Sequence, residues 1–486
     1  MELSIGVRGT AARFALVLML VVAADWLLMD VGAGLNYAVF AALLVLALVL
    51  TQPRLLLRPQ ALAAVAAVLG LVAALVWQPG PLVMSMSLGG LMAVAVWRRP
   101  AGWPSGGRWM YQGLNFAFAG CLKAFLDIPV LDRWYRSRMS GGRLANNVDG
   151  FLKRWWLPVL LSLVFLGLFV IANPLLSTCL QTVLEAINEL LLYLPQTLST
   201  GRLFVWMLVG LWCWALLRLR RIRRPPAVGA QLPVLADEDL LPALLERCLW
   251  LFNLVFLLQN VLDARYLWAG AQLPEGIAPH TYVHRGSYPL VATALLAALF
   301  VLVAFRQGLA RAPLRRARVL VIVWLLQNVF LTASAGWRLW LYVQEFMLTR
   351  LRVATIIWLV LVAVGLLLIA LRIIQERNNR WLVNVNFAIL VAVLYTCCFV
   401  NFDRHIADYN VRHCQTVRAN GKELHLEYLT HLGPDSLPAL DWLIERTPDP
   451  LLHGRLILAR DDLRAQLADR QAHWRTWTAT EALLAR

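Results

Sequence analysis

Four polar residues recur at helical spacing within one apolar stretch of the chain. Glu246, Asn253 and Asn260 follow one another at intervals of seven, and Asp263 comes three residues later, all within 244–268. This spacing places the four side chains on one face of a helix. An unsatisfied polar group in hydrocarbon is costly, so this face cannot point at lipid. It must point at other helices or at water, and we interpret it as the lining of a cavity.

Similar side chains occur in two later apolar stretches, whereas 290–305 and 353–370 hold almost nothing polar. We therefore expect 244–268, 319–335 and 381–400 to surround an outward-opening polar cavity, and the other two stretches to face lipid. The alternative for any single amide is packing between helices, which contributes about 0.6 kcal/mol. The side chains concerned are Gln259, Gln327, Asn328, Thr332, Asn384 and Asn386.

Charged residues of both signs lie near the outer ends of the expected spans. The basic ones are Arg265, Arg285, Arg338, Arg350 and Arg352, and the acidic ones are Asp25, Asp30, Asp263, Glu345, Asp403 and Asp408. Arginine suits carboxylate or phosphate, so the group could form an anion site. The alternative is a salt-bridged collar, which the need of buried charges for partners favours. Asp25 lies within an otherwise apolar span, where an ionisable residue is a functional candidate.

All eight histidines follow residue 279, in parts that we expect on the outer side of the membrane. A metal or acid–base site could be built from some of them with neighbouring acids. The alternative is that the polar parts of the chain simply hold the histidines. No HExxH or comparable signature is present, and we predict neither a metal ion nor a cofactor. The residues considered are His280, His284, His405, Asp408, Tyr409 and His413, together with Asp263 and Glu345.

The composition indicates a polytopic, all-α membrane protein. Of 486 residues, 60% are hydrophobic and 15% are charged, and apolar runs of about 18 residues or more recur. The net charge of +17 comes from arginine clusters between these runs, which is the positive-inside pattern, so we do not expect nucleic-acid binding. The seven cysteines are scattered without a CxxC, and a disulfide between Cys179 and Cys414 is left open.

The arginine clusters predict about 11 transmembrane helices, with the N-terminus inside and the C-terminus outside. The first run, 12–28, is expected to be an uncleaved span rather than a signal peptide. A short amphipathic element is expected over 337–349, after the span 319–335. Five regions follow: a four-helix membrane bundle (1–97), a cytoplasmic amphipathic and basic segment that could contact anionic lipid (98–154), a helix pair with an outer amphipathic helix and a cytoplasmic linker (155–240), a membrane core (241–400) and a periplasmic helical tail (401–486).

An internal repeat lies in the second half. LLQNV occurs at 257–261 and at 325–329, and each copy is followed by VAT, at 291–293 and 353–355. Two parallel helical hairpins of similar design are the natural interpretation. Chance similarity between apolar segments is the alternative.

The second half also resembles a known family. The segments LLQNVLDARYLW (257–268), YVHRGSYPLV (282–291), TRLRVATIIW (349–358) and NFDRHIADYNVRHC (401–414) are similar to an uncharacterised family of bacterial multi-pass inner-membrane proteins, a domain of unknown function of the 4173 type. The resemblance implies a bacterial inner-membrane location and a helical architecture. It brings no known activity, so it assigns no catalytic residue.

Three functions remain open. The preferred one is binding or translocation of a small or lipid-head-group anion through the polar cavity. The second is an enzyme acting at the outer leaflet with His284, His405 or Asp408 as acid or base. Of the two classes, we favour a protein that is not an enzyme. The third is a scaffold or sensor whose tail binds a periplasmic protein. In each case the lipid bilayer is a partner.

Overall fold

The computed structural model describes residues 2–51, 59–96, 200–217, 240–269, 315–418 and 421–485, together with residues 106, 107, 109, 113 and 182. Within these ranges, some side chains, including those of 2–11 and 240–248, are not described. The described elements are helices, and the one β contact among them is an isolated bridge between Cys414 and Lys422. Cys414 is a buried free thiol.

The chain forms two compact units. The first comprises Met1–Leu75, Ser87–Pro100 and Tyr111–Ile222, and the second comprises Val76–Met86, Ala101–Met110 and Arg223–Arg486.

In the first unit, α1 (Glu2–Leu28) packs against α2 (Leu35–Thr51) and α9 (Thr200–Leu217). Most of α3 (Pro59–Trp77) and α4 (Pro81–Val96) also belongs to this unit. The buried Asn36 holds the turn between α1 and α2, because its Nδ2 donates to the carbonyl of Leu27 at 2.9 Å and its Oδ1 accepts from the N–H of Gly34 at 2.9 Å. The amide therefore satisfies a carbonyl at the end of α1 and an N–H directly before α2, where helices leave backbone groups without internal partners.

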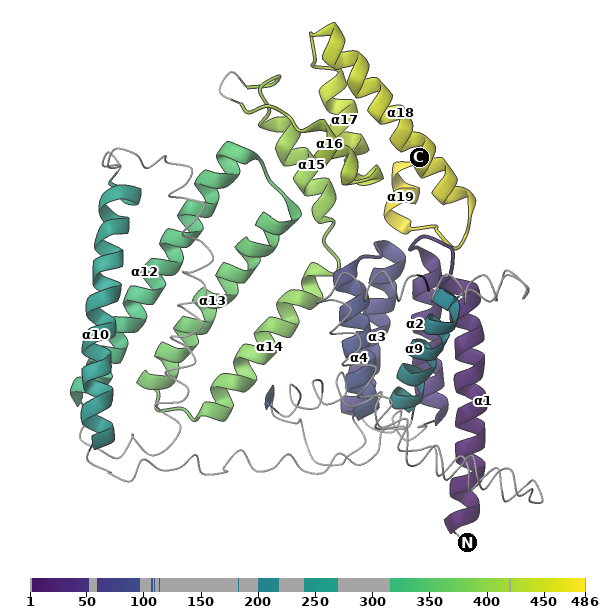
Figure 1. Ribbon diagram of the computed structural model, residues 1–486, viewed down its shortest axis with the longest axis horizontal. Helices are drawn as coiled ribbons and strands as arrows, with labels where there is room; N and C mark the ends of the chain where they lie inside the picture. The colour runs from purple at the N-terminus through teal and green to yellow at the C-terminus, as the bar shows by residue number, and fades with distance from the viewer. Residues whose placement is uncertain are drawn as a thin grey trace. The chain divides into compact units, whose positions relative to one another are not determined.

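In the second unit, four long elements follow one another in the order of the chain (Figure 1). They are α10 (Leu240–Leu262), which continues into the π-helical turn η2 (Asp263–Trp268), then α12 (Arg315–Phe346), α13 (Arg350–Ile374) and α14 (Asn379–Cys397). α10 packs against α12, α12 against α13, and α13 against α14. A core of buried apolar side chains, including Leu249, Trp324 and Leu366, joins α10, α12 and α13.

α12 is one continuous helix of 32 residues, so the expected division into a span at 319–335 and a separate element over 337–349 is wrong. Gly336 lies between them but does not end the helix. The reason is that Arg338, the residue that made 337–349 look like a surface element, is buried and paired with a carboxylate. Because its charge has a buried partner, Arg338 can lie within a packed helix and does not need a surface position.

The connection between α12 and α13 is short and tightly held. Met347 has a positive φ of 66°, which is uncommon for a residue with a side chain. The Arg352 guanidinium donates to the carbonyls of Phe346 and Met347 and lies 4.5 Å above the Tyr342 ring. A cation at this position satisfies carbonyls that the end of α12 leaves open.

After residue 400 comes a group of shorter helices that we call the C-terminal region, residues 401–485. Side chains of Asn401, Asp449 and Thr478 cap α15, α18 and α19 by accepting from backbone N–H groups. A core including Ile406, Leu440 and Leu456 holds the helices together. The elements are α15 (Phe402–Arg412), α16 (Leu426–His431), the 3-10 turn η4 (Pro434–Ser436), α17 (Leu437–Ile444), α18 (Pro450–Ala472) and α19 (Ala479–Leu484).

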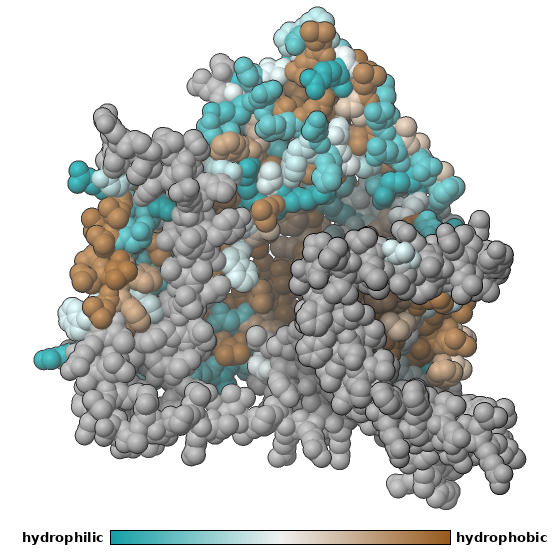
Figure 2. All heavy atoms as spheres, viewed as in Figure 1, coloured by the Kyte–Doolittle hydropathy of each residue, from teal (hydrophilic) through white to brown (hydrophobic). Residues whose placement is uncertain are grey.

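Four of the described helices are long and apolar enough to cross a membrane: Pro59–Trp77, Val319–Phe346, Arg350–Ile374 and Asn379–Cys397. Figure 2 shows hydrophobic side chains over α10, where Leu254 is 64% exposed, and mainly hydrophilic ones over the C-terminal region. Large apolar surfaces of this kind need lipid around them. The fold is therefore that of an α-helical integral membrane protein in contact with the bilayer. The number of eleven spans and the sides on which the termini lie stay predictions.

Among the described residues, α14 does not take the interior position expected for it. In the most apolar 18-residue stretch of α12, 50% is buried, whereas in that of α14 only 6% is buried. α14 packs on α13, the helix that was expected to face lipid. Its Asn386 donates to the carbonyl of Leu382 in the same helix at 2.9 Å, so this amide needs no polar neighbour.

Candidate functional site

α10 and α12 run parallel and are joined by polar side chains. Asn253 Nδ2 donates to the carbonyl of Leu320 at 3.0 Å, and Asn260 Nδ2 donates to the carbonyl of Gln327 at 3.2 Å, so each bond joins residues 67 positions apart. The two LLQNV copies lie 68 positions apart in the sequence. The two similar helices therefore pack side by side, shifted by one residue from their sequence correspondence.

Hydrogen bonds fix the orientation of the amides in this interface. Asn253 Nδ2 donates to two backbone carbonyls, so its Oδ1 must be the atom that accepts from Gln327 Nε2 at 3.1 Å. Asn260 and Asn328 also spend their NH₂ groups on carbonyls. Within the part of the chain that the structure describes, the buried side-chain oxygens of Asn260, Gln327 and Asn328 have no hydrogen-bond partner.

The polar edge of α10 thus faces α12, as a stripe in an apolar helix must. Asn253 and Asn260 are 7% and 8% exposed, so at these positions the edge is packed against a neighbour and does not line an opening. The side chain of Glu246 lies outside the description. An interface of this kind holds two helices together through amides, which is the simpler of the two interpretations that the sequence left open.

An ion pair lies at the end of the same interface, in the π-helical turn. Asp263 is fully buried and pairs with Arg338 of α12, which is 2% exposed, and Gln259 Nε2 donates to Asp263 Oδ1 at 2.8 Å. Trp268 donates to Ser334 Oγ at 3.0 Å and stacks on Trp337. π-helical turns are often found at functional positions, and a buried ion pair is stable only while both partners are present.

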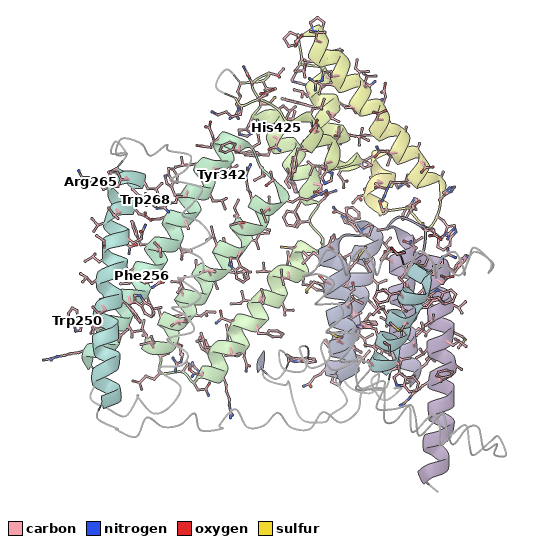
Figure 3. The ribbon with its side chains drawn as sticks, viewed as in Figure 1. Trp250, Phe256, Arg265, Trp268, Tyr342 and His425 are labelled. Carbon is pink, nitrogen blue, oxygen red and sulfur yellow. The ribbon has the colours of Figure 1, made fainter. Side chains whose placement is uncertain are left out.

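Side chains on the opposite side of α10 point away from α12. Figure 3 shows Trp250 and Arg265 on that side, whereas Phe256 and Trp268 lie toward α12. Trp250 is 61% exposed, and Arg265 is exposed with its guanidinium 5.8 Å from the Tyr266 ring. Arg265 therefore does not join the Asp263–Arg338 pair.

The other predicted charged residues mostly form separate pairs. Arg350 binds Asp403 through two bonds of 2.6 and 2.9 Å, and Lys422 binds Glu345 at 2.8 Å. In the first unit, Arg202 pairs with Asp30, and Trp206 Nε1 donates to Asp25 Oδ1 at 2.7 Å. Arg285 lies outside the described residues. These pairs match the salt-bridged alternative better than a shared anion site.

The histidine cluster does not come together in the described part of the chain. His405 is exposed and Asp408 is half-buried, while His413 bonds the carbonyl of Tyr409 at 2.8 Å and stacks on its ring at 4.1 Å. No three His, Cys, Asp or Glu side chains of the described residues are placed to hold a metal ion. His280 and His284 lie outside these residues.

The C-terminal region holds the α12–α13 connection through Asn410. The side chain of Asn410, which is 4% exposed, makes two hydrogen bonds to the backbone of Leu348. Tyr428 lies beside the same connection, and its hydroxyl accepts from the N–H of Arg350 at 2.9 Å. Met347 enters the core of the C-terminal region. We call these contacts of Met347, Leu348 and Arg350 the clamp.

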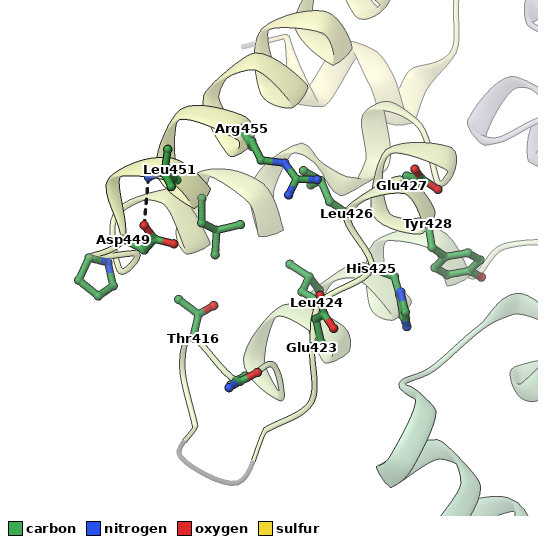
Figure 4. Close-up of a pocket in the computed structure, with 13 residues that line it drawn as sticks. Thr416, Glu423, Leu424, His425, Leu426, Glu427, Tyr428, Asp449, Leu451 and Arg455 are labelled. Carbon is green, nitrogen blue, oxygen red and sulfur yellow. Dashed lines mark hydrogen bonds between the residues drawn. The ribbon is translucent and has the colours of Figure 1, made fainter.

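A groove of about 970 Å³ opens in the C-terminal region (Figure 4). Its wall on one side is the extended segment before α16, and its wall on the other is the start of α18. Tyr428 belongs both to this groove and to the clamp. The lining residues are Gln415, Thr416, Glu423, Leu424, His425, Leu426, Glu427, Tyr428, Pro448, Asp449, Leu451, Leu452 and Arg455.

Sequence reasoning missed Asn410, Lys422 and Tyr428 as site residues. A signal existed for Asn410, because it lies on the apolar face of α15 with Ile406 and Val411, where an amide needs a buried partner. Lys422 and Tyr428 gave no such signal, since their partners are about 80 residues away in the chain.

These features define a helical integral membrane protein with a polar helix pair and a clamped C-terminal region. The chain belongs to the family described as a domain of unknown function (DUF4153), which it matches over residues 11–443. The family is thus an uncharacterised one, as the resemblance implied, but its number is 4153 and not 4173. No curated protein and no solved structure matches the chain.

Proposed function

We propose that this chain is a multi-pass sensor or scaffold of the bacterial inner membrane, whose C-terminal region lies on the periplasmic side and binds a ligand or protein. The observation that carries the proposal is the clamp, with Asn410 bonding the backbone of Leu348 between two membrane helices. The C-terminal region is hydrogen-bonded to the backbone of the α12–α13 hairpin. A movement of this region on binding can therefore move the hairpin.

The groove and the clamp share residues. Tyr428 lines the groove and accepts from the N–H of Arg350, the first residue of α13. Lys422, which directly precedes the groove residue Glu423, pairs with Glu345 near the end of α12. A ligand that shifts residues 422–428 must therefore disturb contacts with both helices of the hairpin. Coupling between the groove and the hairpin requires contacts that differ between the bound and the free state, and these contacts meet that requirement.

From the clamp, α12 leads to the buried ion pair. Arg338 lies eight residues before Phe346, the last residue of the continuous helix α12, and it pairs with Asp263 of η2. A helix moves as a rigid element over this length, so a tilt of α12 at the clamp changes the geometry of the pair. We infer that the groove, the hairpin and the α10–α12 interface form one coupled path.

Anion binding or translocation through a polar cavity has less support. Arg338 and Arg350 are held by carboxylates, and Arg352 is held by two carbonyls, so none of the three offers its charge to a ligand. An enzyme using His405 or Asp408 is also less supported, since neither residue lines the groove. A thermal-shift screen of the purified protein against anions would restore the first function if Arg265→Ala or Arg285→Ala removed a response.

Hydrogen–deuterium exchange of the full-length protein in lipid nanodiscs tests the proposal. Asn410→Ala removes the two hydrogen bonds of the clamp to Leu348, so we expect faster exchange in 347–352 and also in 423–428. Asn386→Ala is the matched control, because Asn386 bonds only a carbonyl of its own helix. Faster exchange confined to 347–352 would mean that the groove is not coupled to the hairpin, and the sensor function would then be abandoned.

A further inference from the structure

We propose that the groove of the C-terminal region takes an extended, basic peptide segment. This inference rests on the proposed ligand-binding function and names the class of ligand. A volume of about 970 Å³ is large enough for several residues of an extended chain.

The charge of the lining favours a basic ligand. The lining holds three acidic residues, Glu423, Glu427 and Asp449, and one arginine, Arg455. Asp449 accepts from the N–H of Leu451 at 3.0 Å as the cap of α18. Glu423 and Glu427 have no ion pair with any residue that the structure describes, so their carboxylates are available to lysine or arginine side chains.

Apolar side chains lie between the charges. Leu451 is 82% exposed at the start of α18, and Leu424, Leu426 and Leu452 also line the groove. An exposed leucine beside carboxylates suits a segment in which apolar and basic residues alternate. A polyamine would meet the carboxylates but leave the leucines uncovered.

The backbone of one wall is open to pairing. Lys422 is bridged to the neighbouring segment, since its carbonyl accepts from the N–H of Gln415 at 2.8 Å. Residues 423–425 then form neither helix nor strand before α16 begins. Within the described chain, the backbone groups of Glu423 and Leu424 make no backbone hydrogen bond. Such an edge can accept an added strand, with affinity from the main chain and specificity from the side chains.

A bound metal ion is a weaker fit for the same carboxylates. Among the described residues, no three His, Cys, Asp or Glu side chains come close enough together to hold one. The acids are instead spread along the groove, on 423–427 and at the start of α18, which suits charges spaced along a peptide.

Fluorescence anisotropy of labelled peptides on the full-length protein tests this inference. The protein is held in nanodiscs of zwitterionic lipid, and empty discs are the blank, because basic peptides bind anionic lipid. The probe is a short peptide of alternating lysine and valine. We compare it with the same peptide carrying glutamate for lysine, and with one carrying N-methyl groups on alternate backbone nitrogens.

We expect the basic peptide to bind, the acidic one not to bind, and the N-methylated one to bind more weakly. Glu423→Gln with Glu427→Gln should weaken binding at least about fivefold. Asp462→Asn, an exposed acid of α18 outside the groove, is the control and should leave binding unchanged. Equal binding of the acidic peptide, or no loss in the double variant, overturns the basic-peptide class. Equal binding of the N-methylated peptide overturns the strand pairing.

The two proposals fail separately. If none of the peptides binds while Asn410→Ala still raises exchange in 423–428, the ligand class is wrong and the sensor function stands. If the basic peptide binds but exchange in 423–428 does not respond to the clamp, the groove is a docking site without coupling to the hairpin.

Discussion

Asn410 bonds the backbone of Leu348 with both ends of its side-chain amide. Its Oδ1 accepts from the Leu348 N–H at 2.7 Å, and its Nδ2 donates to the Leu348 carbonyl at 2.9 Å. Leu348 is the middle residue of the three that connect α12 to α13. One side chain thus replaces the backbone partners that a strand would provide, and it ties the C-terminal region to two membrane helices.

Replacing Asn410 by alanine should destabilise the C-terminal region. The change leaves the N–H and the carbonyl of Leu348 without partners in a partly buried place, which costs about 1–3 kcal/mol. Thermal unfolding in detergent, followed by limited proteolysis within residues 401–485 at rising temperature, measures the loss. Asn386→Ala serves as the comparison, and an equal fall in Tm for the two variants would contradict the importance of the clamp.

The Asp263–Arg338 pair should show strong coupling between its two members. Asp263→Leu or Arg338→Met alone leaves a buried charge uncompensated and should cost about 3–5 kcal/mol. The double variant removes both charges, so its loss in the free energy of unfolding should be much smaller than the sum of the two. A denaturant-unfolding cycle with all four proteins measures this coupling. Simple additivity would show that the two side chains do not depend on each other.

Two asparagines of the α10–α12 interface should differ in their response to leucine. Asn253→Leu removes the partner of Gln327 Nε2 and of the Leu320 carbonyl, so we expect a loss of about 1–3 kcal/mol. Among the described residues, Asn328 donates only within its own helix and its buried Oδ1 has no partner, so Asn328→Leu should be nearly neutral. Unfolding of both variants under one condition checks the order, and the reverse order would mean that Asn328 holds a ligand or water.

The stability of the C-terminal region should depend on pH through Asp435. Burial raises the pKa of Asp435 above its ordinary value of 3.8, and the nearby Asp403 and Glu481 add to the rise, while the hydrogen bond from Asn401 opposes it. The folded state therefore holds this proton more tightly than the unfolded state. Its contribution to stability is present below pH 3.8 and is lost as pH rises through the raised pKa.

Asp435→Asn tests this pH dependence, because an amide oxygen at this position can still accept from Asn401 Nδ2. The variant should have a higher Tm than the unchanged protein at neutral pH, and the difference should shrink as pH falls below 3.8. Asp462→Asn on the surface of α18 is the control. A difference that stays constant over this range would exclude Asp435 as the source.

The sequence allowed the direction of the α10 stripe to be predicted, with 319–335 and 381–400 as the expected neighbours, but not the contacts that the stripe makes. Spacing by sevens is a property of the helix itself, so it placed Asn253, Asn260 and Asp263 on one face before any neighbour was known. The contacts of these side chains depend on how α12 packs against α10. The hydrogen bonds join residues 67 positions apart, and this offset cannot be read from either helix alone. Arg338 illustrates this, since its ion pair forms only because α12 packs where Asp263 is within reach.

The cavity and the position of α14 were harder to predict for a related reason. An asparagine in a helix can satisfy its NH₂ group on the carbonyl four residues earlier, as Asn328 and Asn386 do. Such an amide needs neither water nor a polar neighbour, so its presence in an apolar span does not require a cavity. The groove in the C-terminal region gave no sequence signal, because its walls are far apart in the chain.

Met347 marks where the packing boundary of the protein lies. It belongs by chain order to the membrane hairpin, yet its side chain is part of the core around Ile406 and Leu429. A fragment that starts at Asn401 would lack that side chain and would expose a hydrophobic cavity in its core. The C-terminal region cannot simply be cut free for crystallisation, and a fragment meant to stay monomeric in solution would need residues 347–353 supplied alongside it.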